Sequence, residues 1–296
     1  MSEAMSGRTL GVIGLGVMGE AVALNLLRAG FRLNVYNRTS AKAEPLRAAG
    51  ATVLATPAAV VSASDVVLLV LADGEATDAV LQRGTAGVGL DVRGTTFVNM
   101  ATVDPDYSIA LGQALDEAGA VYVEAPMSGS RRPAEDGTLV ILTAGDGTAI
   151  EALDPVFDVI GKATIHCGTV PNALRMKLAN NLLLIAMLEA FAEAAHFASG
   201  LGLDLEAYFD LILQGPMRNA VFAQKAPQLL SEDFEARAPL KHVLKDLHLV
   251  NALAERAGLA VPVSATNHAL FHEAAELGLG EQDVMAVIRV LEGRPS

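Results

Sequence analysis

Three glycines, Gly14, Gly16 and Gly19, lie directly after an apolar run, Thr9–Ile13, and at the start of a helix-like stretch, Met18–Ala29. In this spacing the first glycine allows a tight turn, the second lets a pyrophosphate approach the backbone, and the third permits close packing of helix on strand. The N–H groups at the helix N-terminus would then face the phosphates. A lone G-x-G-x-x-G is weak evidence, but the strand–turn–helix context favours a dinucleotide site over an ordinary glycine-rich connection.

The chain at the end of the next apolar run, Arg32–Tyr36, indicates which dinucleotide this loop would hold. A site that prefers NAD usually has Asp or Glu here, where the carboxylate accepts hydrogen bonds from the ribose hydroxyls. In this chain the position is the neutral Asn37, Arg38 follows at once, and Lys42 lies on the next turn. A guanidinium pairs well with a 2′-phosphate dianion. The alternative is that the two cations lie on a solvated surface and bind nothing. Of the two interpretations, we favour the phosphate site and therefore expect NADP(H).

A second chemical pattern is the pair Lys177 and Asn181 near the start of a long apolar helix-like stretch. Residues four apart share one face of a helix. A lysine ammonium is ordinarily protonated at neutral pH and can give a proton to a carbonyl oxygen, while the asparagine amide could orient the ammonium or the substrate oxygen. From the spacing alone, a surface lysine near a helix start is the simpler interpretation.

Short apolar runs alternate with helix-like stretches through the first half of the chain, which is typical of a mostly parallel sheet covered on both faces. After Thr9–Ile13 and Arg32–Tyr36, the predicted strands are Thr52–Leu54, Val66–Leu71, Phe97–Met100, Val121–Val123, Val140–Thr143 and Thr164–His166.

Past Gly168 the strand-like runs end and helical periodicity takes over. Pro171 precedes a long predicted helix, Asn172–Ser199, which the Gly200–Gly202 stretch ends. Further predicted helices are Leu205–Gln214, Pro239–Ala257, Ala265–Glu276 and Glu281–Arg289. We therefore expect an α/β Rossmann-type N-terminal domain, residues 7–170, and an all-α C-terminal domain, residues 171–296, joined by the long helix.

The overall composition excludes some classes of protein. A net charge of −13 disfavours nucleic-acid binding, which needs a basic surface. Hydrophobic residues make up 52% of the chain, enough for sizeable cores, and the single cysteine, Cys167, cannot form an intramolecular disulfide. The apolar stretch Leu182–Ala198 contains Glu189 and Glu193, so we expect a buried helix of a soluble protein instead of a membrane span. With no apolar leader in MSEAMSGR, we expect a cytoplasmic location.

Several longer strings resemble the β-hydroxyacid dehydrogenase family, and within it the glyoxylate/succinic semialdehyde reductases most closely. The resemblance runs from about Gly11 to about Leu291. It is carried by GLGVMG, by NRT after the second strand, by EAPMSGSRRPAEDGTLVILTAGD, by ALRMKLANN and by PLKHVLKDLHLV. The long strings are far more specific than the glycine loop.

The resemblance implies roles for individual positions. Lys177 matches the family's catalytic lysine, and Asn181 matches the asparagine one turn later. Ser128 and Gly129, in the MSGS string, match the segment that holds the substrate carboxylate through hydroxyl and backbone N–H. Thr102 matches a threonine beside nicotinamide and substrate. The implied reaction is hydride transfer between NADPH and a small carboxylate-bearing aldehyde or hydroxy acid, with Lys177 as the proton donor.

Lys245 and Asp246 match a KD pair of the helical domain, which implies that the lysine contacts the cofactor and the aspartate the substrate. Family members commonly dimerise through the helical domain, so the resemblance implies a homodimer or a dimer of dimers. The expected cofactor-binding residues are Gly14, Leu15, Gly16, Val17, Met18, Gly19, Asn37, Arg38, Thr39, Lys42, Leu71, Thr102 and Lys245.

Four residues depart from the family pattern. Pro171 and Ala173 stand where many relatives have glycine before the catalytic lysine, and Ala101 stands where a serine is common. Ala238 lies where the close aldehyde reductases have an aromatic ring, so the substrate pocket is expected to be wider.

Two other functions compete with the reductase. An imine reductase or reductive aminase would use the same architecture and NADPH, but such enzymes usually lack both the lysine at position 177 and the SG string. A non-catalytic NADP(H)-binding module would need no such set of reactive residues. No metal is expected: His268 and His272 are four apart, but no H-E-x-x-H frame or third ligand accompanies them. Arg131 and Arg132 form either a solvated turn or a source of positive potential near the substrate.

Overall fold

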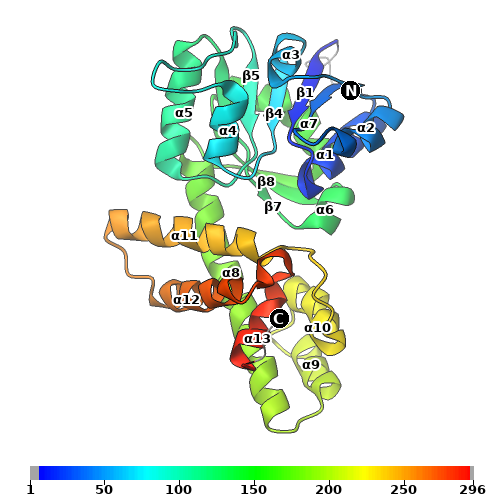
Figure 1. The fold of residues 1–296 in the computed structure, drawn as a ribbon, viewed down its shortest axis with the longest axis vertical. Helices are drawn as coiled ribbons and strands as arrows, with labels where there is room; N and C mark the ends of the chain where they lie inside the picture. The colour runs from blue at the N-terminus through cyan, green and yellow to red at the C-terminus, as the bar shows by residue number, and fades with distance from the viewer. Residues whose placement is uncertain (1–6, 294–296) are drawn as a thin grey trace. The chain divides into compact units, whose positions relative to one another are not determined.

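The protein is described by a computed structural model for residues 7–293 (Figure 1). Its internal contacts divide the chain into two compact units, residues 1–177 and 178–296, here called the nucleotide unit and the helical unit. We expected the boundary after residue 170, whereas this division falls inside helix α8 (Asn172–Gly200). The first six residues, on which the expectation of no targeting segment depends, lie outside the described part of the chain.

The nucleotide unit is built on one sheet with the strand order β3-β2-β1-β4-β5-β6-β8-β7, and β9 pairs with β8. The first six strands pair in parallel, β6 and β7 pair antiparallel with β8, and β8 and β9 are parallel. The mostly parallel sheet of the predicted fold class is therefore confirmed. The strands are β1 (Thr9–Ile13), β2 (Arg32–Tyr36), β3 (Thr52–Val53), β4 (Val66–Leu69), β5 (Thr96–Asn99), β6 (Val121–Glu124), β7 (Met127–Ser128), β8 (Leu139–Gly145) and β9 (Gly161–His166).

The central strands are buried on both faces, because alternate residues of such a strand pack in different cores. In β4, Val66 and Leu68 pack in one core, and Val67 and Leu69 in the other. One core includes α1 (Val17–Arg28), α2 (Glu44–Ala48), α6 (Arg131–Glu135) and α7 (Gly147–Ile160). The opposite core includes α3 (Pro57–Ser62), α4 (Gly74–Leu81) and α5 (Pro105–Glu117), and Figure 1 shows these helices around the sheet.

The helical unit gathers shorter helices around the buried side of α8, in a core that includes Ile185, Phe191 and Ala195. Figure 1 shows the helices α11 (Leu240–Ala257) and α12 (Pro262–Glu276) lying side by side across α8. Gly258, with φ of +65°, ends the first of them in the left-handed conformation that glycine adopts readily. The elements are α9 (Leu205–Gln214), α10 (Ala220–Ser231), α11 (Leu240–Ala257), α12 (Pro262–Glu276), the short 3₁₀ turns η3 (Leu279–Glu281) and η4 (Val284–Val287), and α13 (Ile288–Leu291).

The predicted helix over Glu281–Arg289 is wrong. Asp283 interrupts it, because its carboxylate accepts from the Met285 N–H and caps η4. Helix α10 was missed, since Pro227 lies inside it and proline is unfavourable in a helix interior. The signal that marks its start is Asn219, whose side chain accepts from the Phe222 N–H.

Helix α8 is long and apolar enough to cross a membrane by length and composition, a test that core helices of soluble proteins also pass. We expected it to be buried, but only 39% of its most apolar window is buried. Leu183 and Phe197 are 61% and 67% exposed, whereas Ile185, Phe191 and Ala195 of the same helix are buried in the core of the unit.

Candidate active site

The glycine loop between β1 and α1 has the geometry that its spacing predicts. Gly14 has φ of +100°, and a Cβ there would lie 2.2 Å from the Val70 carbonyl oxygen. A Cβ on Gly19 would lie 1.9 Å from the Gly14 carbonyl oxygen, so helix and turn touch directly. A Cβ on Gly16 would meet no described atom within 4 Å, so this residue keeps its side open. Close packing requires the outer two glycines, and the middle one leaves the space that a phosphate needs.

The N-terminus of α1 offers backbone N–H groups beside a cavity of about 240 Å³. Gly16 is the N-cap, and no side-chain hydrogen bond caps the helix within the described chain. Lys42 and Arg131 are among the residues that line this cavity, although Arg131 also pairs with Glu135 at 2.7 Å. N–H groups and cations around an open glycine fit the phosphates of a dinucleotide.

Asn37 holds the glycine loop against the end of β2. Its Oδ1 accepts from the Leu15 N–H at 2.9 Å, and its Nδ2 donates to the Thr39 carbonyl at 3.0 Å. Arg38 and Thr39 follow on the exposed surface, and Lys42 lies in the 3₁₀ turn η2 (Ser40–Ala43). The exposed Arg38 guanidinium therefore follows directly on the residue that anchors the phosphate loop.

Two further expected residues follow the carboxyl ends of neighbouring parallel strands. Leu71 follows β4, and its Cδ2 lies 2.9 Å from the position of a Cβ on Gly14. Thr102 follows β5, where the Ala101 N–H donates to Asn99 Oδ1 at 3.2 Å. Ligands of open α/β sheets bind outside the carboxyl ends of the strands, so both residues lie where a cofactor is expected.

Ser128 and Gly129 lie at the short strand β7, which the sequence patterns did not predict. Ser128 ends β7 and pairs with Val140 of β8. Gly129 has φ of +136°, and a Cβ there would lie 2.7 Å from Leu139 Cδ2. The half-exposed Ser128 hydroxyl and the neighbouring backbone are thus held in a turn in which glycine is required.

Lys177 lies in the first turns of α8, and the side chain expected to be reactive is buried, at 8% exposure. Ala173, one of the residues that depart from the family pattern, is fully buried against Leu142 and Ala144 of β8. Pro171 is buried as well. The spacing alone suggested an ordinary surface lysine, and the burial of Lys177 argues against that interpretation.

A buried carboxylate that the sequence patterns did not predict lies beside this helix start. Glu124, at the end of β6, is fully buried. Its Oε1 accepts from Ser108 Oγ at 2.5 Å and its Oε2 from the Leu174 N–H at 3.3 Å. Burial raises the pKa of the Glu124 carboxyl above its ordinary value, and the hydroxyl and backbone N–H donors oppose that shift. The EAP string contains Glu124, but nothing local reveals its partners, which are 16 and 50 residues away.

In the helical unit, three of the expected residues lie together. Asn181 Nδ2 donates to Asp246 Oδ2 at 2.7 Å, and the Lys245 ammonium lies 3.2 Å from Asp246 Oδ1. Asp246 therefore joins α8 to α11 and is shielded by an amide and a cation. Ala238, by contrast, packs at the edge of the helical core, and its N–H donates to Asp283 at 3.0 Å.

The two histidines noted in the sequence, His268 and His272, lie on α12, and His248 of α11 lies near them. The His268 ring centroid lies 6.3 Å from that of His272 and 6.2 Å from that of His248. Within residues 7–293 no group of three or more His, Cys, Asp or Glu residues is arranged to hold a metal ion.

Two family models match almost the whole described chain. Residues 9–168 match the model described as the NAD binding domain of 6-phosphogluconate dehydrogenase. Residues 172–291 match the model described as NAD-binding of NADP-dependent 3-hydroxyisobutyrate dehydrogenase. The fold and the glycine loop thus define a nicotinamide-nucleotide-dependent oxidoreductase.

Full-length relatives narrow this class. Glyoxylate/succinic semialdehyde reductase 1 of Arabidopsis thaliana is 37% identical over 96% of this chain and 98% of its own length. Glyoxylate/succinic semialdehyde reductase 2, chloroplastic, of the same plant is 35% identical over 97% of this chain and 80% of its own length. The chain belongs to the β-hydroxyacid dehydrogenase family.

Solved structures agree with this assignment. Psf3 in complex with NADP+ and 2-OPP matches with a TM-score of 0.86 and 26% identity, over 96% of this chain and all of that one. An imine reductase from Pseudomonas sp. matches with a TM-score of 0.66 and 23% identity, over 96% and 99%, and shares the fold alone. The family, enzyme-class and cofactor predictions are confirmed: this is an NADP(H)-dependent oxidoreductase.

Proposed function

We propose that this oxidoreductase reduces a small carboxylate-bearing aldehyde to the hydroxy acid, or catalyses the reverse reaction. The names of the two Arabidopsis relatives support an aldehyde acid of the glyoxylate or succinic semialdehyde type. The observation that carries the proposal is the buried Lys177, held in the same unit as the glycine loop. Burying a lysine ammonium costs free energy, so a buried lysine in the dinucleotide-binding unit indicates a role in proton transfer. A lysine that only made the surface soluble would stay exposed.

The bound NADPH would supply the hydride for the carbonyl carbon. Lys177 donates the proton to the carbonyl oxygen and stabilises the negative charge that develops there. Ser128 and the N–H of Gly129 hold the substrate carboxylate, and Thr102 orients the reacting groups. Arg38, with Lys42, binds the 2′-phosphate of the cofactor, next to the loop that Asn37 anchors.

In the helical unit, the linked group of Asn181, Lys245 and Asp246 completes the proposed machinery. Asp246 accepts a hydrogen bond from Asn181, which orients the amide, and its other carboxylate oxygen lies at ion-pair distance from Lys245. Asn181 assists Lys177 from the next turn of α8, Lys245 serves the cofactor and Asp246 serves the substrate. We further propose that residues 7–170 act as the dinucleotide-binding domain and residues 171–296 as the helical substrate and dimerisation domain.

Lys177→Ala tests this proposal. We expect NADPH-dependent turnover of glyoxylate and succinic semialdehyde to fall by roughly 10² to 10⁴, the usual contribution of a general acid. NADPH affinity, measured by fluorescence titration, should stay close to that of the wild type. Lys162→Ala, which removes an exposed lysine of the same unit, is the matched control and should keep full turnover. Normal turnover of Lys177→Ala would remove the lysine from the proton-donor role.

The substrate panel separates the competing functions. Aldehyde acids of increasing length and cyclic imines should be tested with NADPH under the same conditions. Turnover of imines alone would identify an imine reductase, and saturable NADPH binding without turnover of any compound would identify a cofactor-binding module. Ala238→Phe should shift preference toward the shortest aldehyde acid if this position lines the pocket.

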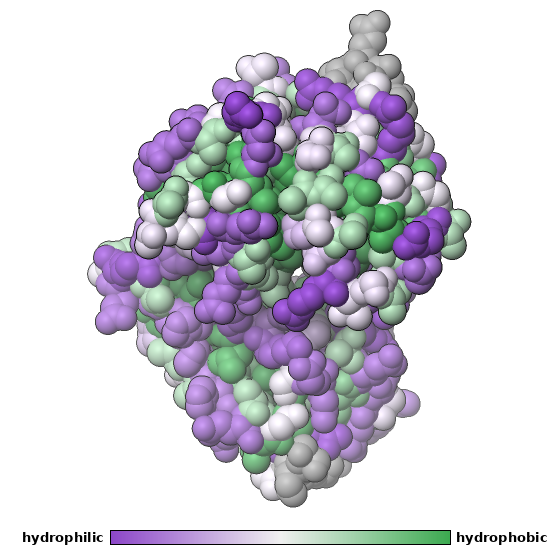
Figure 2. Space-filling model, turned by 45° about the horizontal axis from the view of Figure 1, so that its top comes forward, coloured by the Kyte–Doolittle hydropathy of each residue, from purple (hydrophilic) through white to green (hydrophobic). Residues whose placement is uncertain are grey.

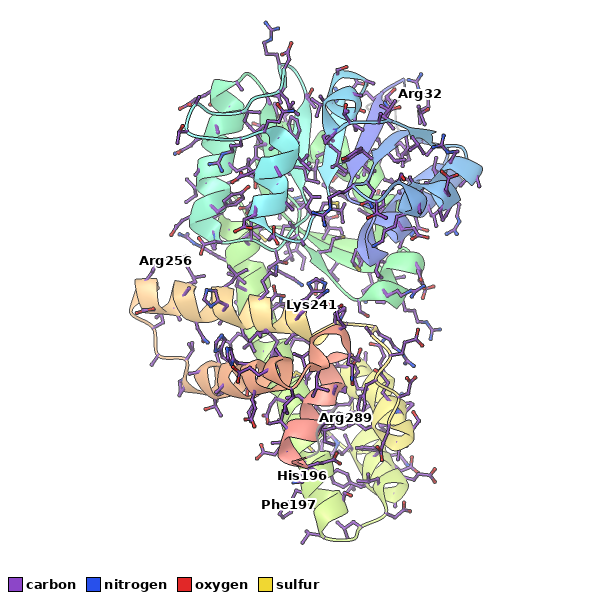
Figure 3. All side chains as sticks on the ribbon, in the orientation of Figure 1. Arg32, His196, Phe197, Lys241, Arg256 and Arg289 are labelled. Atoms are coloured by element: carbon purple, nitrogen blue, oxygen red, sulfur yellow. The ribbon has the colours of Figure 1, made fainter. Side chains whose placement is uncertain are left out.

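We also propose that a second copy of the chain covers the exposed side of α8, giving a homodimer or a dimer of dimers. In the helical unit the spacing of Leu183, Met187, Ala190, Ala194 and Phe197 alternates four and three residues, the repeat of a helix–helix seam. Leu183 and Phe197 are strongly exposed, and Figure 3 shows the labelled Phe197 extending outward from α8. A surface that matches itself suits a symmetric pair of identical helices.

Light scattering of Leu183→Lys with Phe197→Lys tests the dimer. We expect the double variant to be monomeric, whereas Leu259→Lys, at a residue that is 66% exposed in the turn between α11 and α12, should stay oligomeric. An unchanged mass would contradict this interface.

Hydrophilic side chains cover much of the visible face in Figure 2, with apolar residues in smaller groups between them. We also propose a cytoplasmic location with no nucleic-acid or membrane partner, and the net charge of −13 supports the absence of a nucleic-acid partner.

A further inference from the structure

A chain of buried hydrogen bonds runs through the nucleotide unit and ends on Glu124. Asn99 Nδ2 donates to the Tyr122 hydroxyl at 3.1 Å, and that hydroxyl lies 2.7 Å from Ser108 Oγ. Ser108 in turn donates to Glu124 Oε1 at 2.5 Å. Asn99, Ser108 and Glu124 are fully buried and Tyr122 is 8% exposed, so water does not compete for these bonds.

The direction of these bonds is consistent along the whole chain. The Ser108 hydroxyl has one hydrogen and gives it to Glu124, so Tyr122 must donate to Ser108 and accept from Asn99. Every dipole therefore points its positive end toward the carboxylate. A carboxylate offers acceptors only, and an acceptor is what this arrangement requires at its end.

Both ends of the chain of bonds reach backbone next to proposed active-site residues. At one end, Asn99 Oδ1 accepts from the N–H of Ala101, the residue before Thr102. At the other, Glu124 Oε2 accepts from the Leu174 N–H in the first turn of α8, and the Ala173 N–H also bonds to this carboxyl. The first N–H groups of a helix have no partner within it, so Glu124 acts as a cap supplied from a distant strand.

We propose that Glu124 is a positioning residue that fixes the first turn of α8, and with it Lys177, relative to the segment that carries Thr102. Lys177 is three residues beyond Leu174, so a displacement of this first turn displaces its ammonium. The proposal rests on the proton-donor role proposed for Lys177. Glu124 itself takes no part in the chemistry, since its oxygens are committed to Ser108 and to the helix start.

Glu124→Gln breaks this arrangement with little change in shape. An amide that keeps its oxygen toward Ser108 turns its NH₂ toward the Leu174 N–H, and the opposite orientation reverses the donors at Ser108 and Tyr122. One end of the chain of bonds is therefore lost in either orientation. Glu124→Asp keeps the charge, but the side chain is one methylene shorter and cannot reach both partners at once.

The test compares kcat with cofactor affinity in the full-length protein. For Glu124→Gln we expect kcat to fall roughly tenfold to a hundredfold, as displacements of about 1 Å do in other enzymes. The Kd of NADPH, measured by fluorescence titration, should change less than about twofold, because the glycine loop is untouched. Glu124→Asp should recover part of kcat. Asn34→Ala, which removes buried bonds to Ala63 and Ser64 in the same unit, is the matched control and should keep kcat while losing stability.

The double variant Lys177→Ala with Glu124→Gln shows whether Glu124 acts through the lysine. If it does, Glu124→Gln adds no further loss of kcat once Lys177 is absent. An additive further loss, or a wild-type kcat for Glu124→Gln, overturns this inference. If Lys177→Ala alone retains turnover, the proposed function fails instead, so the two failures are distinguishable.

Tyr122→Phe keeps the proposal testable if Glu124→Gln does not fold. It removes one hydroxyl from the middle of the chain of bonds and leaves Glu124 bonded to α8. We expect a loss of kcat of roughly twofold to fivefold, smaller than for Glu124→Gln because the cap on α8 survives. A larger loss of kcat than in Glu124→Asp would contradict the placement of the decisive contact at the helix start.

Discussion

The two units each bury a carboxylate completely, but they stabilise it in different ways. In the nucleotide unit, Glu124 is bonded by a hydroxyl and by backbone N–H groups of α8. In the helical unit, the Lys225 ammonium lies 2.7 Å from Asp283 Oδ1 and also donates to Gln228. Burial lowers the pKa of Lys225, and the charge of Asp283 opposes that shift.

Asp283 also accepts from the backbone N–H groups of Arg237, Ala238 and Met285. It thereby joins α10, the segment before α11 and the turn η4, which are distant in sequence. An ion pair in this position holds elements together, whereas the dipoles around Glu124 orient one helix start. In this protein, the buried carboxylate that meets a full countercharge holds several elements together, whereas the one that meets only directed hydrogen-bond donors positions a single helix start.

Lys225→Ala should produce the largest effect, because it leaves Asp283 buried without its cation. We expect the free energy of unfolding to fall by about 3–5 kcal/mol. Urea unfolding of the full chain measures this. Lys241→Ala, which breaks an exposed pair with Glu281 and is labelled in Figure 3, should cost less than about 1 kcal/mol. Equal losses in the two variants would remove the special role of the buried pair.

Arg38→Ala tests a cation of a different kind from Lys225. Arg38 lies on the surface of the nucleotide unit, where we expect it to bind a ligand instead of a carboxylate of the protein. We expect NADPH binding to weaken by about 1.5–3 kcal/mol, the range for hydrogen bonds to charged groups, with NADH binding and unfolding unchanged. Arg47→Ala removes a neighbouring exposed arginine and should leave both affinities as they are. Equal weakening of NADPH and NADH would contradict the 2′-phosphate assignment.

Glu124→Gln should destabilise the protein less than Lys225→Ala does. The change leaves a buried donor or acceptor unpaired, which costs about 1–3 kcal/mol, but it leaves no isolated charge. Urea unfolding measured side by side with Lys225→Ala gives the ranking. A greater loss in Glu124→Gln would show that the nucleotide unit also depends on its carboxylate mainly for cohesion.

The smallest expected effect is a difference in pH dependence. Because burial raises the pKa of Glu124, its protonated form is favoured by folding. This contribution is fully present below the unfolded pKa, about 4.3, and is lost as pH rises through the folded value. The stability of the wild type relative to Glu124→Gln should therefore decrease as pH is raised above the unfolded pKa. Parallel stability curves for the two proteins would contradict a raised pKa.

Local patterns predicted most of the fold. The bounds of β1 and β2 are those expected from apolar runs, and α8 begins at the expected Asn172 because the residues before it mark the helix start. The two-residue β7 was missed because such a short strand has no alternation to detect. The end of the chain was predicted as one helix because its apolar spacing is helical, whereas a distant partner, Lys225, draws Asp283 into a capping position.

The candidate site divides in the same way. The role of Gly19 follows from spacing, because the Gly14 carbonyl on the preceding turn excludes a side chain there, whereas the contact that excludes a side chain at Gly14 comes from the distant Val70. Asn37 was expected as a neutral cofactor residue, and the structure adds that it anchors the glycine loop. The bond between Asn181 and Asp246 joins positions 65 residues apart, and no local pattern could reveal it.

Local sequence patterns were enough to predict the features that depend on residues close together in the chain: the strand and helix periods, the dinucleotide loop and the cation after Asn37. The tertiary structure decided which buried polar groups meet, because a carboxylate such as Glu124 is stabilised only by donors that folding brings to it. Hydrogen bonds depend on distance and direction in space, so the partners of Glu124, Asp246 and Asp283 became visible only with the chain folded.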